Sequence, residues 1–323
     1  MGRKYLLVGG AGFIGSHCLK RLIAHESNVI TVFDNFCTGR KWHIEKYEDP
    51  PRVTIVRGDV KDFEHLKKVM EGHDTVYHFA ANADISKAAL EPSIDFWEGT
   101  YLTNNILEAM RMCKVSRIIY MSGSGVYGDT GNRPVVEDNL YMLPISPYGA
   151  SKLASESLIS AYVHMFDMEA LIFRFANVIG PCQTHGVAYD FILSLLQNSK
   201  ELTILGDGTQ TKSYIYKDDV IDAITHFGKI EHKKLDVFNV ATEDCLTVTE
   251  IAQMVVETLG LKNVSFNYTG GKRGWKGDIP IVYFDSSKLR ATGWRNMYTS
   301  RQAMQLAIDS LIEDARNGKF GIG

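Results

Sequence analysis

Cysteines are few in this chain, and long uninterrupted apolar runs are absent from it. The five cysteines are odd in number, widely spaced and without a Cys-x-x-Cys pair, so we expect neither a disulfide framework nor a zinc site, and a reducing cytosol is the simplest compartment. No apolar run approaches the roughly 20 residues of a membrane-spanning helix. The first run, residues 5–8, is too short for a signal peptide. These shortages predict a soluble, cytoplasmic protein that holds no metal and contacts no membrane.

A strong excess of charge of either sign is missing as well. The chain has 35 lysines and arginines against 38 aspartates and glutamates, a net charge of −3, which argues against nucleic acid as the main partner. It also contains no internal repeat, no low-complexity segment and no linker rich in proline or serine. Its 323 residues, 45% of them hydrophobic, are enough for one large domain or two moderate ones.

What the first half of the chain does contain is a regular alternation of short apolar runs with segments of helical periodicity. Such runs are typical of parallel strands that are buried on both faces. They cover residues 5–8, 29–33, 53–56, 75–79, 117–121 and 170–175. Six repeats of strand and helix predict an α/β fold, a Rossmann doubly wound parallel sheet that binds its ligands at the carboxyl ends of the strands.

The first of these strands runs into a glycine-rich turn, Gly9-x-x-Gly12-x-x-Gly15, which opens the first predicted helix. Such a turn seats a pyrophosphate on a helix N-terminus. Asp34 ends the second strand about 20 residues further on, where a dinucleotide fold places the carboxylate that accepts hydrogen bonds from the ribose hydroxyls. Because a carboxylate repels a 2′-phosphate, the pattern favours NAD over NADP, although the cations at residues 40–41 leave NADP open.

After residue 177 the pattern changes to shorter strands, glycine-rich turns and scattered helices. We therefore predict an NAD-binding Rossmann domain at residues 1–176, with segments near 210–240 returning to it. Residues 177–323 would form mainly a smaller, mixed α/β substrate-binding domain.

One pair of residues has the chemistry of a general base. Tyr148 and Lys152 are four residues apart, which on a helix puts phenol and ammonium on one face, about one turn apart. A free phenol has a pKa near 10, so at neutral pH it is protonated and cannot act as a base. A neighbouring ammonium and a positive nicotinamide would lower that pKa. The spacing alone also recurs in ordinary helices.

In order along the chain, these and further motifs resemble those of the extended short-chain dehydrogenase/reductase family, the nucleotide-sugar epimerases and dehydratases. The resemblance covers nearly the whole chain. The motifs are Gly9-x-x-Gly12-x-x-Gly15, Asp34-Asn35, Gly58-Asp59-Val60, His78-Phe79-Ala80-Ala81, Val126-Tyr127-Gly128, Tyr148-x-x-x-Lys152, Arg174-Phe175-Ala176-Asn177, Gly206-Asp207-Gly208 and the segment 214–220.

The resemblance implies an NAD-dependent enzyme that acts on a UDP- or GDP-linked sugar, and a homodimer formed through a four-helix bundle of the helix within residues 94–112 and the one after Tyr148. Tyr148 would be the general base, and Lys152 would hydrogen-bond the nicotinamide ribose. The residues implied in cofactor binding are Gly9, Gly12, Phe13, Ile14, Gly15, Asp34, Asn35, Asp59, Val60, Ala80, Ala81, Tyr148 and Lys152. Those implied in substrate binding are Asn177, Lys212, Arg273 and His185. Lys212 and Arg273 would pair with the diphosphate, although both also fit solvated surface cations.

The sequence departs from the family pattern at the third catalytic position. The family has a serine or threonine four residues before Tyr127, where this chain has Gly123, flanked by Ser122 and Ser124. Either serine or a water would have to supply the hydroxyl, with Ser124 favoured. Alternatively, both serines only satisfy backbone groups in a tight turn.

The same turn bears on the reaction. The family's 4,6-dehydratases carry an acidic pair where this chain has Ser124 and Gly125, so elimination of water is disfavoured. We expect a C4 epimerase that reduces and reoxidises its cofactor within each turnover. The alternative is a net C4 dehydrogenase that passes hydride to an exogenous acceptor such as a keto acid. A non-catalytic nucleotide-binding protein would need neither Tyr148 nor Lys152.

Overall fold

The computed structural model describes residues 2–82, 84–226 and 232–319. The chain divides into two compact units, here called the first and the second unit. The first unit comprises Met1–Val126, Pro147–Arg174 and Ala223–Phe238. The second unit comprises Tyr127–Ser146, Phe175–Asp222 and Asn239–Gly323.

The residue ranges of the two units differ from those predicted. Residues 127–146, expected in the first domain, belong to the second unit, and the segment that returns to the first unit is Ala223–Phe238 rather than residues 210–240. The reason is a backbone bridge between distant segments. Val135 pairs with Phe284, and its amide donates to the carbonyl of Tyr283 at 2.8 Å. This pairing ties the loop to the second unit.

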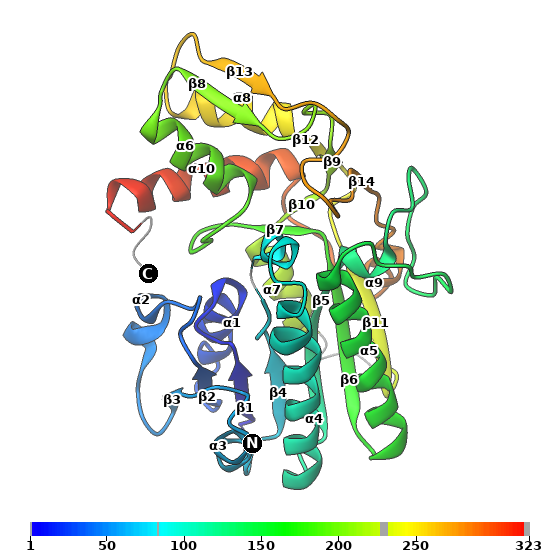
Figure 1. Ribbon diagram of the computed structural model, residues 1–323. Helices are drawn as coiled ribbons and strands as arrows, with labels where there is room; N and C mark the ends of the chain where they lie inside the picture. The colour runs from blue at the N-terminus through cyan, green and yellow to red at the C-terminus, as the bar shows by residue number, and fades with distance from the viewer. Residues whose placement is uncertain (1, 83, 227–231, 320–323) are drawn as a thin grey trace. The chain divides into compact units, whose positions relative to one another are not determined.

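A seven-stranded sheet forms the centre of the first unit, in the order β11-β6-β5-β4-β1-β2-β3 (Figure 1). The strands are β1 (Lys4–Val8), β2 (Val29–Asp34), β3 (Val53–Arg57), β4 (Thr75–His78), β5 (Arg117–Gly123), β6 (Glu169–Phe175) and β11 (Leu235–Val240). β1 pairs in parallel with both β2 and β4, β2 with β3, and β4 with β5. The predicted doubly wound parallel sheet is confirmed, and its strand order reverses between β1 and β4, the place where such sheets bind ligands.

Helices connect the strands of this sheet. They are α1 (Phe13–Ile23), α2 (Lys41–Ile44), α3 (Phe63–Met70), α4 (Tyr101–Cys113), α5 (Pro147–Met165) and α7 (Lys217–His226). Short 3₁₀ turns lie at Glu45–Tyr47, Ile85–Ala89 and Ser124–Tyr127. The core contains fully buried residues of β1, such as Leu6, together with Ile106 of α4 and Ile159 of α5. Burial of these apolar faces drives the sheet and helices together.

The helix predicted within residues 94–112 is not uniform. It opens with a π-helical turn at Phe96–Thr100, and α4 follows from Tyr101. Such turns are rare and often lie at functional sites.

The second unit contains shorter strands and four helices within its described residues. The strands are β7 (Asn177–Ile179), β8 (Glu201–Ile204), β9 (Thr211–Lys212), β10 (Tyr214–Tyr216), β12 (Leu246–Thr247), β13 (Ser265–Tyr268) and β14 (Ile281–Val282), and the helices α6 (Val187–Gln197), α8 (Val248–Thr258), α9 (Ser287–Ala291) and α10 (Ser300–Arg316). Capping boxes begin α8 at Thr247 and α10 at Thr299. Each satisfies two backbone amides that a helix start otherwise leaves unpaired. The apolar faces of α6, α8 and α10 share one core.

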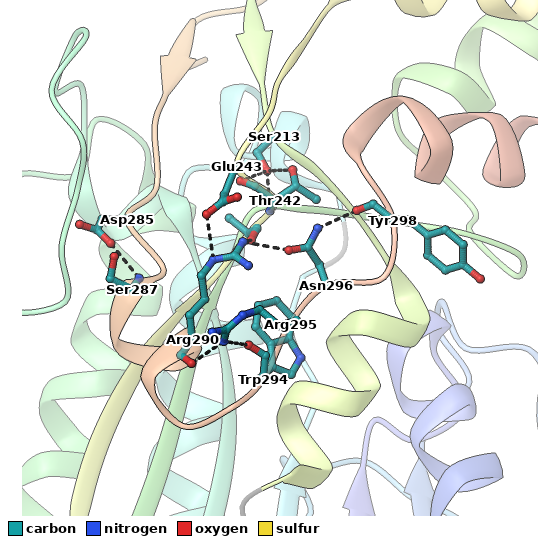
Figure 2. Close-up of polar contacts among 11 residues, drawn as sticks. Ser213, Thr242, Glu243, Asp285, Ser287, Arg290, Trp294, Arg295, Asn296 and Tyr298 are labelled. Carbon is teal, nitrogen blue, oxygen red and sulfur yellow. Dashed lines mark hydrogen bonds and ion pairs between the residues drawn. The ribbon is translucent and has the colours of Figure 1, made fainter.

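Polar contacts around Arg290 hold the segment before α10 within the second unit (Figure 2). The Arg290 guanidinium donates to the side-chain oxygen of Asn296 at 2.9 Å and pairs with Glu243 at 3.4 Å. Asn296 in turn donates to the carbonyl of Tyr298 at 2.8 Å. The indole of Trp294, 2% exposed, donates to the carbonyl of Asp219 at 3.2 Å. These contacts connect α9, the segment before α10 and the start of α7, which belongs to the second unit up to Asp222.

Candidate active site

The glycine turn after β1 is shaped by close backbone approaches. Gly9 has φ +78°, and a Cβ there would lie 2.5 Å from the amide nitrogen of Ala80. A Cβ on Gly15 would lie 2.7 Å from the Cα of Gly10. Helix α1 starts at Phe13 with no side-chain cap, so its first amides are available to an anion. The turn therefore has the shape and the donors of a pyrophosphate cradle.

The acid that ends β2 lies beside this turn. Asp34 is 7% exposed. One of its oxygens accepts from the amide of Ala11 at 2.8 Å, and the other accepts from the amide of Phe36 at 2.8 Å. Burial raises the pKa of Asp34, while the two amide donors lower it. Each carboxylate oxygen keeps a second lone pair, so the group can still accept hydrogen bonds from two hydroxyls.

The other predicted cofactor residues follow neighbouring strands. The side chain of Asn35 donates to Asp59 at 3.1 Å, which joins the ends of β2 and β3. The carbonyl of Val60 accepts from Asn105 of α4 at 3.1 Å. Ala80 and Ala81 follow β4, while Phe13 and Ile14 are half-buried at the start of α1. Parallel pairing brings the carboxyl ends of these strands to one edge of the sheet.

The phenol and the ammonium lie together at the start of α5. The Nζ atom of Lys152 lies 5.7 Å from the centroid of the Tyr148 ring and 5.0 Å from that of Tyr120. Lys152 is 7% exposed and donates to the carbonyl of Met121 at 2.7 Å. The Tyr148 hydroxyl has no hydrogen-bond partner in the described part of the chain. It is therefore available to a ligand.

In the protein alone the pKa of Tyr148 is raised, so the predicted lowering by the ammonium and a bound nicotinamide stays a prediction. Burial raises the pKa of Tyr148 to about 12, and the charge of Asp95 adds to the rise. Burial lowers the pKa of Lys152 to about 8, against the charges of Glu156 and Asp95. Low-dielectric surroundings disfavour the phenolate, and a carboxylate near the pair opposes it further. The phenol therefore keeps its proton at neutral pH unless a bound group adds positive charge.

The two serines beside Gly123 differ in their contacts. Ser122 is 4% exposed and donates to Glu156 at 2.5 Å. Ser124 is half-buried, and its hydroxyl has no hydrogen-bond partner among the described residues. A Cβ added at Gly123 would meet no atom within 4 Å. The hydroxyl of Ser122 is therefore already used, whereas that of Ser124 can meet a ligand.

Asp95 and Asn82, two further residues of this region, were not predicted from the sequence. Asp95 is 2% exposed, and its Oδ1 accepts from the side chain of Asn82 at 2.9 Å. An acid at the start of an apolar helix that follows a predicted ligand-binding strand was the available signal.

The predicted substrate residues all lie in the second unit. Lys212 pairs with Asp278 at 2.6 Å. Arg273 pairs with Asp129 at 2.6 Å and also donates to the carbonyl of Asp278 at 3.0 Å. Asp278 thus brings the two cations together, and neither is simply solvated.

The other two predicted substrate residues lie in the segment of that unit from β7 to the start of α6. Asn177 begins β7 and donates to the carbonyl of Ser213 at 3.3 Å. His185 lies in the loop before α6, where its ring nitrogen lies 3.4 Å from the hydroxyl of Thr184. Their roles remain predictions.

Residues 2–82, 84–226 and 232–319 contain neither a group of metal ligands nor a membrane-spanning helix. No three histidine, cysteine or acidic side chains gather there as metal ligands do. No helix in this part of the chain has both the length and the apolar character that crossing a membrane requires.

Comparison with known proteins identifies relatives over nearly the full length. Residues 5–241 match the profile of the NAD dependent epimerase/dehydratase family. A protein of Methanocaldococcus jannaschii that carries the provisional name UDP-glucose 4-epimerase is 31% identical, over 96% of this chain and 99% of its own. The human dTDP-D-glucose 4,6-dehydratase is 26% identical, over 98% of this chain and 92% of its own.

Solved structures also match this chain over nearly its full length. The crystal structure of UDP-glucuronic acid 4-epimerase from Bacillus cereus, in complex with UDP-glucuronic acid and NAD, has a TM-score of 0.87 and 27% identity. The match covers 96% of this chain and 99% of that one.

Proposed function

Because the chain belongs to the NAD dependent epimerase/dehydratase family, and is therefore an NAD-dependent enzyme, we propose that it is a 4-epimerase of a nucleotide-diphosphate sugar. Relatives named as 4-epimerases cover it almost completely. The observation that carries the proposal is the pair at the start of α5. Tyr148 presents a hydroxyl without a protein partner, beside an ammonium that the Met121 carbonyl fixes.

The residues of the first unit fit the NAD that the family requires. A Cβ at Gly9 or Gly15 would collide with neighbouring backbone, so glycine at both positions allows the tight turn that leaves the first amides of α1 to an anion. Asp34 is oriented by two backbone amides. We assign the pyrophosphate to this turn and the adenosine ribose to Asp34. Bound NAD would supply a hydride acceptor that can also return the hydride. Lys152 would hold the nicotinamide ribose.

Tyr148 would take the proton of the C4 hydroxyl as the C4 carbonyl forms. Because its pKa is about 12 in the protein alone, the phenol needs positive charge close by before it can act as this base. The same phenol would return the proton once the opposite face of the sugar is reduced. Ser124, rather than Ser122, would hydrogen-bond the reacting oxygen, since Ser122 already donates to Glu156.

Dehydration is a weaker candidate although a human 4,6-dehydratase is among the relatives. Elimination of water needs an acid and a base beside the sugar. The chain has Ser124 and Gly125 where the dehydratases carry their acidic pair. Epimerisation needs neither group.

A net C4 dehydrogenase is the second candidate, and Gly123 is the observation that favours it. The open space at Gly123 removes one hydroxyl that would hold the sugar during rotation. A 4-keto sugar that is held less firmly would leave before its hydride returns.

The diphosphate would bind Lys212 and Arg273 in the second unit. Both cations have carboxylate partners in the protein alone, so a diphosphate would compete with Asp278 and Asp129 for them. A guanidinium can bind phosphate with two parallel hydrogen bonds, whereas the ammonium of Lys212 acts as a point charge.

A homodimer through α4 and α5 completes the proposal. Large apolar side chains remain exposed on and beside these helices. They are Phe96, Trp97, Met112, Met165 and Phe166. Burial of such side chains in a second copy would remove apolar area from water. Light scattering behind size exclusion should give twice the mass of the chain.

The decisive assay is proton NMR of the purified protein with UDP- and GDP-linked sugars, without an added hydride acceptor. An epimer mixture, with no lasting rise of the NADH absorbance, supports the 4-epimerase. If one equivalent of reduced cofactor accumulates per protein chain, and turnover resumes only when a keto acid is added, the protein is a net dehydrogenase and the 4-epimerase proposal is refuted. Tyr148→Phe should abolish either reaction, since the phenol is the proposed base.

A further inference from the structure

The carboxylate of Asp95 is a buried titratable group for which neither reaction above has a use. It lies at the start of the π-helical turn Phe96–Thr100 and is 2% exposed. Its Oδ1 accepts from Asn82 at 2.9 Å. Its Oδ2 is buried and has no hydrogen-bond partner among the residues that the structure describes. A buried carboxylate oxygen without a partner costs free energy, so its presence calls for a reason.

The π-helical turn fixes where Asp95 lies. The hydroxyl of Ser151 donates to the carbonyl of Asp95 at 2.6 Å and accepts from the amide of Thr100 at 3.0 Å. The hydroxyl is thus inserted between two backbone groups that would otherwise pair in the turn. Gly99 makes room for it, because a Cβ there would lie 2.2 Å from the Ser151 oxygen.

This insertion couples Asp95 to the reacting pair, since Ser151 directly precedes Lys152 on α5. Asn82 adds a second fixed contact from the segment after β4. The carboxylate is therefore held at its side chain and at its backbone, by two elements of the first unit. Within that unit its charge acts on both Tyr148 and Lys152.

We propose that Asp95 is a positioning residue that sets the proton affinity of Tyr148, so that the phenol holds its proton until the positive charge of the bound cofactor outweighs the carboxylate. The inference rests on the proposed role of Tyr148 as base. It assigns to Asp95 the timing of deprotonation, because a like charge disfavours the phenolate.

The other charged groups near the pair do not supply this effect. His78 of β4 is buried and neutral, with a pKa lowered to about 3 by burial and by Lys152. Burial raises the pKa of Tyr120 beyond its usual range, so this phenol stays uncharged. Glu156 is paired with Arg174 at 2.7 Å and acts on Lys152 rather than on Tyr148. Asp95 is thus the one side-chain charge, among the described residues, found to oppose the Tyr148 phenolate.

The test is a titration of Tyr148 in the NAD-loaded protein, followed by the near-ultraviolet absorbance of the phenolate with Tyr148→Phe as the blank. Asp95→Asn keeps the acceptor for Asn82 and removes the charge. It should lower the midpoint by about one pH unit, a tenfold loss of proton affinity. Glu98→Gln is the matched control, because Glu98 lies in the same π-helical turn, pairs with Lys61 and does not act on Tyr148. It should leave the midpoint unchanged.

An unchanged midpoint in folded Asp95→Asn protein would overturn the inference. If that variant does not fold, carbon-13 NMR of tyrosine-labelled wild-type protein gives the answer. The Tyr148 signal should shift in two steps, one when Asp95 ionises and one when the phenol does. A single step would refute the coupling.

The titration needs no sugar, so the two proposals can fail separately. If Asp95→Asn lowers the Tyr148 midpoint but the protein converts no nucleotide sugar, the proposed epimerase activity is refuted and the role of Asp95 stands. If the protein is an active epimerase but Asp95→Asn leaves the midpoint unchanged, the role of Asp95 is refuted and the epimerase activity stands.

Discussion

Truncation of the buried carboxylate of Glu156 should destabilise the protein far more than truncation of a carboxylate at the surface. Arg174 of β6 donates to Glu156 of α5 at 2.7 and 3.0 Å, and the two side chains are 3% and 7% exposed. Ser122 donates to the same carboxylate at 2.5 Å. Glu156→Ala would remove the carboxylate to which the buried Arg174 guanidinium and the Ser122 hydroxyl both donate.

The expected cost follows from the burial of this pair. Removal of one partner of a buried ion pair costs about 3–5 kcal/mol, because the remaining charge is uncompensated. Replacement of both partners by methionine should be close to neutral, since no unpaired charge remains. Glu64→Ala is the control, because Glu64 is 76% exposed in its pair with Lys67. Exposed pairs of this kind contribute below about 1 kcal/mol.

Urea unfolding monitored by circular dichroism measures all three variants. The account predicts a large loss for Glu156→Ala, a small one for Glu64→Ala, and recovery in the double methionine variant. A loss for Glu156→Ala no greater than that of the control would refute the reasoning. A double variant no more stable than the single one would show that packing, rather than the unpaired charge, sets the cost.

Four further outcomes are expected. The pKa of buried His78 is about 3 against about 6.5 when unfolded, so the stability that it contributes is complete above pH 6.5 and falls below it, by about 3 kcal/mol at pH 4.5. Thermal unfolding across pH should show the fall, and His78→Asn should flatten it. Ser124→Ala should lower kcat by about 10²-fold. Gly123→Ser, whose Cβ would meet no atom within 4 Å, should restore part of it in the double variant, and equal rates for wild type and Ser124→Ala would exclude the assigned hydroxyl. Asp34→Ala removes the carboxylate assigned to the ribose and the acceptor of two backbone amides, so calorimetry should find NAD bound at least tenfold more weakly. Unchanged affinity would contradict the ribose assignment. Lys212→Met should raise KM for the nucleotide sugar with kcat little changed, as expected for a binding contact, whereas an equal loss in kcat would place Lys212 in the chemical step.

The fold was predictable from local pattern, and the reasons are visible in the strands. Runs such as residues 5–8 and 118–121 are apolar without alternation, and both lie in buried parallel strands, β1 and β5. The assignment of residues 127–146 to the second unit was not predictable, since it rests on a backbone pairing of Val135 with Phe284 across almost 150 residues of sequence. Nothing local signals such a pairing.

The sequence predicts which residues form the candidate site better than it predicts their pKa values and hydrogen bonds. Spacing alone places Tyr148 and Lys152 on one helix face, and the structure brings them together. The raised pKa of Tyr148 in the protein alone was not predictable, because it depends on burial and on Asp95, which only the folded chain supplies. The same holds for Ser122, whose hydroxyl meets a carboxylate 34 residues away in the sequence.

The central claim is tested most directly with a UDP-sugar that carries deuterium at C4, incubated with the NAD-loaded protein in ordinary water and analysed by NMR. The account predicts that both C4 epimers appear, that each retains the deuterium at C4, and that Tyr148→Phe converts none. The label returns to C4 because the hydride that leaves the sugar is the one that comes back. Deuterium lost to an added keto acid would contradict the account in favour of a net dehydrogenase. Deuterium found at C6 of a 4-keto product would contradict it in favour of a dehydratase.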